Sequence, residues 1–169
     1  MQSLILSKWN YKTILMDSMI LAVIYFTPAF SHLLNMPLYI VEPMRLMLFV
    51  SLLYSNKTNS FIIAASLPFF SLLTSGHPPV FKALLISGEL LLNAALYFYL
   101  SGKIKNYFVP ILLSISLAKI FYYIFKFGFI STGLLAGSLV SISLLTQVII
   151  IVCTSLLFGG LLLMETRKK

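Results

Sequence analysis

Long apolar runs separated by short polar breaks make up almost the whole chain. A helix needs about 20 apolar residues to cross the roughly 30 Å hydrocarbon core of a bilayer. Runs of this kind predict membrane-spanning helices over 14–34, 38–54, 60–75, 79–100, 107–126 and 140–164. The breaks between them carry turn and helix-stop residues, as in 35–37 and 76–79. We therefore expect an all-α polytopic membrane protein, a compact bundle of six transmembrane helices with 1–169 as a single transmembrane domain.

Residues 127–139 and the first apolar run differ from the other segments. Residues 127–139 are apolar and contain glycines, which predicts a re-entrant loop or a short interfacial helix there. The first apolar run is too long for a cleaved signal peptide, and no small-residue cleavage site follows it. We expect it to remain as the first spanning helix.

Composition supports lipid as the main solvent of this chain. Hydrophobic residues make up 60% of the sequence and charged residues only 9%, whereas soluble domains are about half apolar and about a quarter charged. The formal net charge is +8. The basic residues punctuate apolar runs and form no patch, which argues against a nucleic-acid partner. The single cysteine, Cys153, lies in an apolar run and makes no intramolecular disulfide.

The basic residues between the runs predict an orientation. With six spans, eight of them fall on one side of the membrane: Lys8, Lys12, Lys57, Lys103, Lys105, Arg167, Lys168 and Lys169. An excess of Lys and Arg marks the cytoplasmic side. Both termini are therefore predicted to be cytoplasmic.

The other four basic residues, Arg45, Lys82, Lys119 and Lys126, then fall in the outer half of the membrane. A charge at the bilayer centre costs roughly 2.5–3.5 kcal/mol on insertion scales, so each needs a compensating partner. Lys82 and Glu89 share one helix face but are separated by about 10.5 Å along the axis, too far for a direct ion pair. Asn93 continues that face. We predict that it lines a polar cavity open to the outside.

Neighbouring segments have polar faces at similar depth. Glu42 and Arg45 are three residues apart, Lys119 and Tyr123 are four apart, and Gln147 follows Ser143 by four. The candidate substrate-binding residues are Glu42, Arg45, His77, Lys82, Glu89, Asn93, Lys119, Tyr123 and Gln147.

Structural readings of these residues stay open. Arg45 and Lys126 can snorkel to the headgroups, and Glu42 can pair with Arg45 alone. His77 can serve loop packing.

Motifs of common enzymes are missing from the sequence. It contains no HExxH, GxSxG or phosphate-binding glycine loop, and its two histidines, His32 and His77, have no clear third ligand. We predict a protein that is not an enzyme, with no catalytic residue, metal or cofactor.

Six short spans in this length, cytoplasmic termini and polar groups gathered on the outer side resemble the S component of energy-coupling factor (ECF) transporters. The resemblance implies capture of a vitamin or similar micronutrient from outside. It also implies partners, namely a transmembrane coupling protein and two cytoplasmic ATPases, in a bacterial or archaeal cell membrane. Small residues spaced by four on the first helix contact the coupling protein in that family, and Ser18 and Ala22 match this spacing.

The leading hypothesis is therefore a substrate-capture subunit of an ECF-type importer. The excess of basic over acidic residues in the outer half favours a small anionic or zwitterionic ligand. One alternative is a structural scaffold resembling the cell-shape membrane protein MreD. Another is a small membrane enzyme acting on a lipid or isoprenoid, with Glu42, His77 and Glu89 as acid–base candidates.

Overall fold

The computed structural model describes residues 11–166 as a bundle of helices, with no strand in that part of the chain. The helices are α1 (Tyr11–Leu33), the 3₁₀ helix η1 (Leu38–Val41), α2 (Pro43–Tyr54), α3 (Lys57–Ser75), α4 (Val80–Ser101), α5 (Phe108–Ser131) and α6 (Leu144–Thr166). The predicted all-α class is confirmed. Lys8, Arg167, Lys168 and Lys169 lie outside the described residues, so their predicted side is a proposal.

Five of these helices are long and apolar enough to cross a membrane, namely α1, α3, α4, α5 and α6. Several such helices are what a multi-pass membrane protein requires. The exception is α2, whose 12 residues extend only about 18 Å. The helix predicted over 38–54 is divided into η1 and α2.

The division falls at Glu42, whose backbone is in the left-handed region with φ 53° and ψ 60°. A non-glycine residue seldom adopts this conformation. Pro43 follows as the first residue of α2, a position where its missing N–H is not needed. The hydrophobic pattern across 38–54 gave no sign of this break.

The end of α5 also differs from the prediction. The helix continues to Ser131 instead of ending at 126, and α6 begins at Leu144 instead of at 140. The segment predicted as a re-entrant loop or interfacial helix is thus partly the last turns of α5. The remainder belongs to a non-helical loop over 132–143, in which Gly133 and Gly137 have positive φ. We call this segment the α5–α6 loop.

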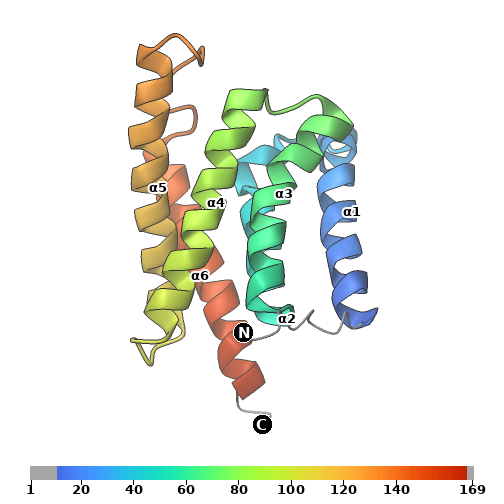
Figure 1. Ribbon diagram of the computed structural model, residues 1–169, viewed down its shortest axis with the longest axis vertical. Helices are drawn as coiled ribbons and strands as arrows, with labels where there is room; N and C mark the ends of the chain where they lie inside the picture. Colours follow the sequence, from blue (N-terminus) through green and yellow to red (C-terminus); the bar gives the residue numbers. More distant parts are fainter. Residues whose placement is uncertain (1–10, 167–169) are drawn as a thin grey trace, which may run out of the picture.

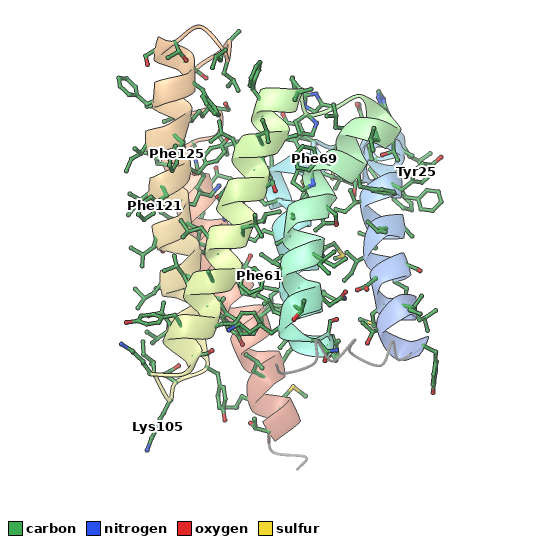
Figure 2. The ribbon with its side chains drawn as sticks, in the orientation of Figure 1. Tyr25, Phe61, Phe69, Lys105, Phe121 and Phe125 are labelled. Atoms are coloured by element: carbon green, nitrogen blue, oxygen red, sulfur yellow. The ribbon has the colours of Figure 1, made fainter. Side chains whose placement is uncertain are left out.

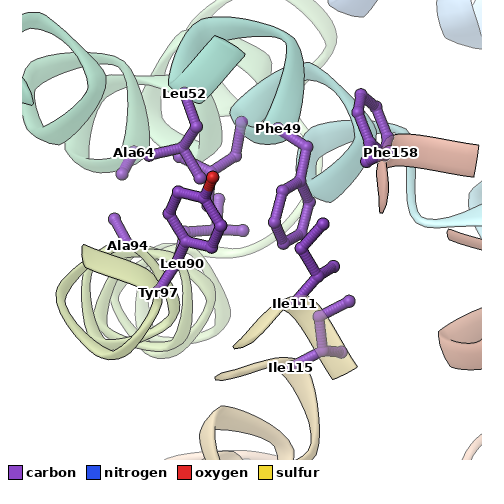
Figure 3. Packing of buried hydrophobic residues seen from close by; sticks show 10 residues of the cluster. Phe49, Leu52, Ala64, Leu90, Ala94, Tyr97, Ile111, Ile115 and Phe158 are labelled. Atoms are coloured by element: carbon purple, nitrogen blue, oxygen red, sulfur yellow. The ribbon is translucent and has the colours of Figure 1, made fainter. Parts of the chain in front are cut away.

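Two apolar clusters hold the bundle together. In the larger one, Phe49 of α2 lies edge-on to Tyr97 of α4 with ring centroids 6.0 Å apart, and it also packs against Phe158 of α6 (Figure 3). The second cluster joins Ile20 and Ile24 of α1 to α3. Met47 and Val50 of α2 also pack against this second cluster, so the short α2 contacts both halves of the bundle.

The two ends of the bundle differ in character. Lys57 begins α3, and Lys103 and Lys105 lie in the turn between α4 and α5. In Figures 1 and 2 these positions lie at the end where α1 begins and α6 finishes. We call this the lysine end. The opposite end, the loop end, carries the α1–α2 connection, the α3–α4 turn and the α5–α6 loop (Figure 1).

Candidate functional site

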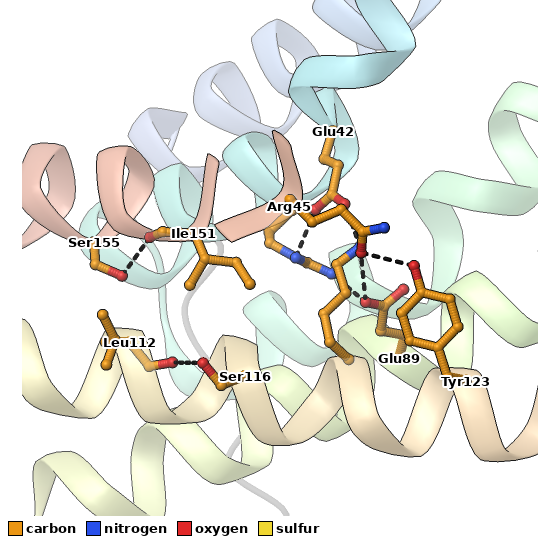
Figure 4. Close-up of polar contacts among 10 residues, drawn as sticks. Glu42, Arg45, Glu89, Leu112, Ser116, Tyr123, Ile151 and Ser155 are labelled. Atoms are coloured by element: carbon orange, nitrogen blue, oxygen red, sulfur yellow. Dashed lines mark hydrogen bonds and ion pairs between the residues drawn. The ribbon is translucent and has the colours of Figure 1, made fainter. Parts of the chain in front are cut away.

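Four charged side chains from three helices form a buried ion network near the middle of the bundle (Figure 4). Arg45 of α2 pairs with Glu42 at 2.5 Å and, through its Nη2, donates a hydrogen bond to Glu89 Oε1 on α4. Lys119 of α5 donates to Glu42 Oε1, and its Nζ lies 3.8 Å from Glu89 Oε1. Two acids and two bases compensate one another, so the network is neutral overall.

The shortness of α2 explains how this network forms. Because α2 begins deep in the bundle, Glu42 and Arg45 reach the middle turns of α4 and α5, where Glu89 and Lys119 lie. The side chains of Arg45 and Glu89 are only 5% and 6% exposed. A buried charge that lost its partner would be strongly unfavourable. The residue with the left-handed backbone, Glu42, thus also has its carboxylate paired with two cations, Arg45 and Lys119.

Some buried polar atoms beside the network have no partner in the described part of the chain. Asn93, one turn after Glu89, is 0% exposed, and neither its amide nitrogen nor its oxygen makes a hydrogen bond. The Nε of Arg45 is buried and unbonded as well. Buried polar groups are almost always satisfied in native proteins, so each exception calls for a reason.

Toward the loop end, polar contacts connect α5 to the α5–α6 loop and α6. The Tyr123 hydroxyl donates to Gln147 Oε1 at 2.7 Å, and Gln147 Nε2 donates to the carbonyl of Ile142 at 2.8 Å. Lys126 Nζ donates to the carbonyl of Leu139 at 2.8 Å and to the Ser141 hydroxyl at 3.2 Å. These bonds tie the loop to α5.

Lys82 belongs neither to the ion network nor to the polar contacts near the loop end. It is half-buried on α4, and none of the hydrogen bonds or ion pairs between described residues involves it. Glu89, on the same face, takes Arg45 and Lys119 as its partners. Glu89 thus has partners on other helices, as its spacing from Lys82 predicted, whereas a partner for Lys82 stays a prediction.

An apolar groove of about 440 Å³ lies between α4 and α5, with Glu89 among its lining residues. The rest of its wall is Leu84, Leu85, Gly88, Leu92, Phe121, Tyr122, Phe125 and Phe129. A ligand in this groove would meet aliphatic and aromatic surface along most of its length and a carboxylate at one point.

The remaining predicted residues lie elsewhere. His77 is exposed in the α3–α4 turn, where its carbonyl accepts hydrogen bonds from Ser71 and Ser75. Its ring makes no hydrogen bond to a described residue, so Glu42, His77 and Glu89 are not joined as an acid–base set. Ser18 and Ala22 are exposed on α1, on a surface that a partner helix can reach.

Two residues absent from the predicted site gain importance in the structure. Lys126 is only 4% exposed, which does not fit snorkelling. Its spacing of seven from Lys119 on one helix was a usable signal. The Tyr122 ring lies between them, with its centroid 5.9 Å from the amine of each lysine. Sequence spacing alone does not distinguish this tyrosine from the lipid-facing aromatics.

Comparisons of the chain with protein-family models, with curated proteins and with solved structures find no match.

Proposed function

We propose that this protein is the substrate-capture subunit of an ECF-type importer in a bacterial or archaeal cell membrane. In this proposal the lysine end faces the cytoplasm and the loop end faces outward. A small anionic or zwitterionic solute enters from the loop end. A coupling protein and two cytoplasmic ATPases then drive its release, with Ser18 and Ala22 on the exposed side of α1 as the coupling contact.

The observation that carries the proposal is the set of unpaired polar atoms beside the ion network. In a network with only a structural role, we expect every buried polar atom to be hydrogen-bonded, because a buried donor or acceptor without a partner costs about 1–3 kcal/mol. The side chain of Asn93 is fully buried, and both its amide nitrogen and its amide oxygen lack a hydrogen-bond partner. It lies on α4, the helix that also carries Glu89 and Lys82. A bound polar ligand would supply the missing partners.

The test is purification of the tagged chain from its native host in mild detergent. We expect the two ATPases and the coupling protein to co-purify, each recognised by its own sequence. Native mass spectrometry is expected to detect a bound small molecule in wild-type protein and less of it in Asn93→Leu. A chain that purifies alone, with no adduct in either form, would reject the proposal.

A scaffold function is the second candidate, and one observation favours it. The four network charges neutralise one another directly, which is also how helices are fixed in a packing role. A scaffold would retain its partners when Asn93 is made apolar and would show no small-molecule adduct. Co-purification of cell-wall or cell-shape proteins instead of ATPases would support this function.

A further inference from the structure

Lys126 has a buried positive charge that only neutral groups contact. Its amine donates to a backbone carbonyl and to a serine hydroxyl in the α5–α6 loop. An ammonium group has three donors, so one remains for another acceptor. At 4% exposure the Lys126 side chain is almost completely covered by protein. A buried charge is costly, and pairing with an opposite charge lowers that cost.

Two further lysines lie on turns near Lys126. Lys119 precedes it by seven residues on α5. Lys82 follows Phe81, and the centroid of the Phe81 ring lies 6.3 Å from that of Phe129, three residues after Lys126. Lys119 already pairs with the acids of the ion network. Lys82 has no ion pair within the described part of the chain. The carboxylates nearest in the bundle, Glu42 and Glu89, are already paired with Arg45 and Lys119.

None of the acidic side chains that the structure describes is placed to compensate them. Glu42 and Glu89 are taken by the neutral network. Asp17 accepts two hydrogen bonds from Asn59, both at 2.7 Å, in the first third of α1, the helix that begins at the lysine end. Glu165 lies in the last turn of α6, about 30 Å along that helix from the loop end. A compensating negative charge is therefore expected from outside the described part of the chain.

We propose that Lys82 and Lys126 together bind an anionic group, a carboxylate or phosphate, beneath the α5–α6 loop. This inference rests on the proposed function and places the anionic part of the ligand. Arg45 and Lys119, the other two basic residues of the predicted outer half, are neutralised by Glu42 and Glu89. They border the proposed site on the side toward the middle of the bundle. Two lysines around one anion form charge-assisted hydrogen bonds, which are roughly twice as strong as neutral ones.

The apolar groove between α4 and α5 indicates that the ligand also has an apolar part. Leu85 and Glu89 line the groove three and seven residues after Lys82, and Tyr122 and Phe129 line it four before and three after Lys126. The groove thus follows the same turns of α4 and α5 as the lysines. An anionic group attached to an apolar body fits this arrangement. Both a dissolved amphipathic solute and an anionic phospholipid have that chemistry.

The experiment measures thermal unfolding of the full chain in phosphatidylcholine nanodiscs. Inorganic phosphate is titrated against chloride at equal ionic strength. We expect a saturable rise in midpoint for wild-type protein. Lys82→Met and Lys126→Met should each weaken the apparent affinity at least tenfold, whereas Lys82→Arg, which keeps the charge, should retain it. Lys57→Met, at the lysine end, is the matched control and should behave as wild type.

A second arm omits phosphate and replaces part of the phosphatidylcholine with phosphatidylglycerol. Stabilisation that depends on Lys82 in this arm identifies the lipid headgroup as the source, and stabilisation by phosphate alone identifies a dissolved ligand. The inference is overturned if wild-type protein shows no saturable rise in either arm, or if both lysine variants respond as wild type does. Lys82 makes no bond in the described chain, so its variant should fold. Co-purification of the ATPases, measured separately, tests the proposed function whatever this result.

Discussion

Replacing Glu89 by glutamine tests whether the ion network stabilises the bundle. The change keeps the shape of the side chain and removes one negative charge from a site that is 6% exposed. Arg45 then loses one of its two acidic partners, and the network changes from neutral to a net charge of +1. Removing one partner of a buried pair destabilises by roughly 3–5 kcal/mol. We expect about 3 kcal/mol, the low end of that range, because Glu42 still pairs with both cations.

Variants that change the net charge of the network in the opposite direction, or restore it to zero, give a sharper test. Arg45→Met leaves the network at −1 and should cost a similar free energy of unfolding. The double variant Glu89→Gln/Arg45→Met is neutral again, so its cost should be smaller than the sum of the single costs by at least about 2 kcal/mol. Lys105→Met, in the exposed turn at the lysine end, should change stability by no more than about 0.5 kcal/mol.

The assay is equilibrium unfolding in mixed micelles of dodecylmaltoside and sodium dodecyl sulfate, read by pulse proteolysis. The four proteins and the wild type are measured at the same total detergent concentration. Single variants within about 1 kcal/mol of wild type, or a double variant whose cost equals the sum, would refute the claim that these charges compensate one another in the folded state.

Three further predictions address the groups around the network. Asn93→Leu should leave the free energy of unfolding unchanged or raise it by about 1 kcal/mol, since it removes two unpaired amide atoms. A clear loss of stability in the same unfolding assay would show that the amide has a partner in the folded protein. Tyr123→Phe should lower the free energy of unfolding by about 0.5–1.5 kcal/mol, because the hydrogen bond to Gln147 is lost. Tyr122→Phe should lower it less, because the Tyr122 hydroxyl makes no hydrogen bond to a described residue. Equal losses of stability would contradict this prediction. In intact cells, Lys103→Cys should resist a membrane-impermeant thiol reagent and His77→Cys should react, and the reverse pattern would invert the proposed orientation.

Hydropathy was sufficient to predict the helical class, because a backbone in lipid must satisfy its hydrogen bonds within the segment. It failed at Glu42, where the backbone is left-handed between η1 and α2 and the carboxylate contacts Arg45 and Lys119. Those contacts join residues 3 and 77 positions apart, and only the first spacing can be read from a helical pattern.

The predicted site shows the same limit. Spacing placed Lys82, Glu89 and Asn93 on one face of α4, and two of the three are buried there. It could not show that Glu89 is neutralised while Lys82 is not, because that depends on which turns of α2 and α5 approach α4. Nor could it separate a snorkelling Lys126 from a buried one, since the difference depends on the α5–α6 loop.

The depth at which α2 begins has a consequence for biosynthesis. A segment of 12 residues that begins beside a Glu and an Arg is a poor candidate for insertion by itself, because each charge opposes transfer from the translocon into lipid by roughly 2.5–3.5 kcal/mol. The groups that compensate these charges, Glu89 and Lys119, are synthesised dozens of residues later. The network can therefore be completed only after the ribosome has produced α4 and α5. A nascent chain that stops after α3 would pack its second helix against α1 and α3, with Glu42 and Arg45 paired only with each other.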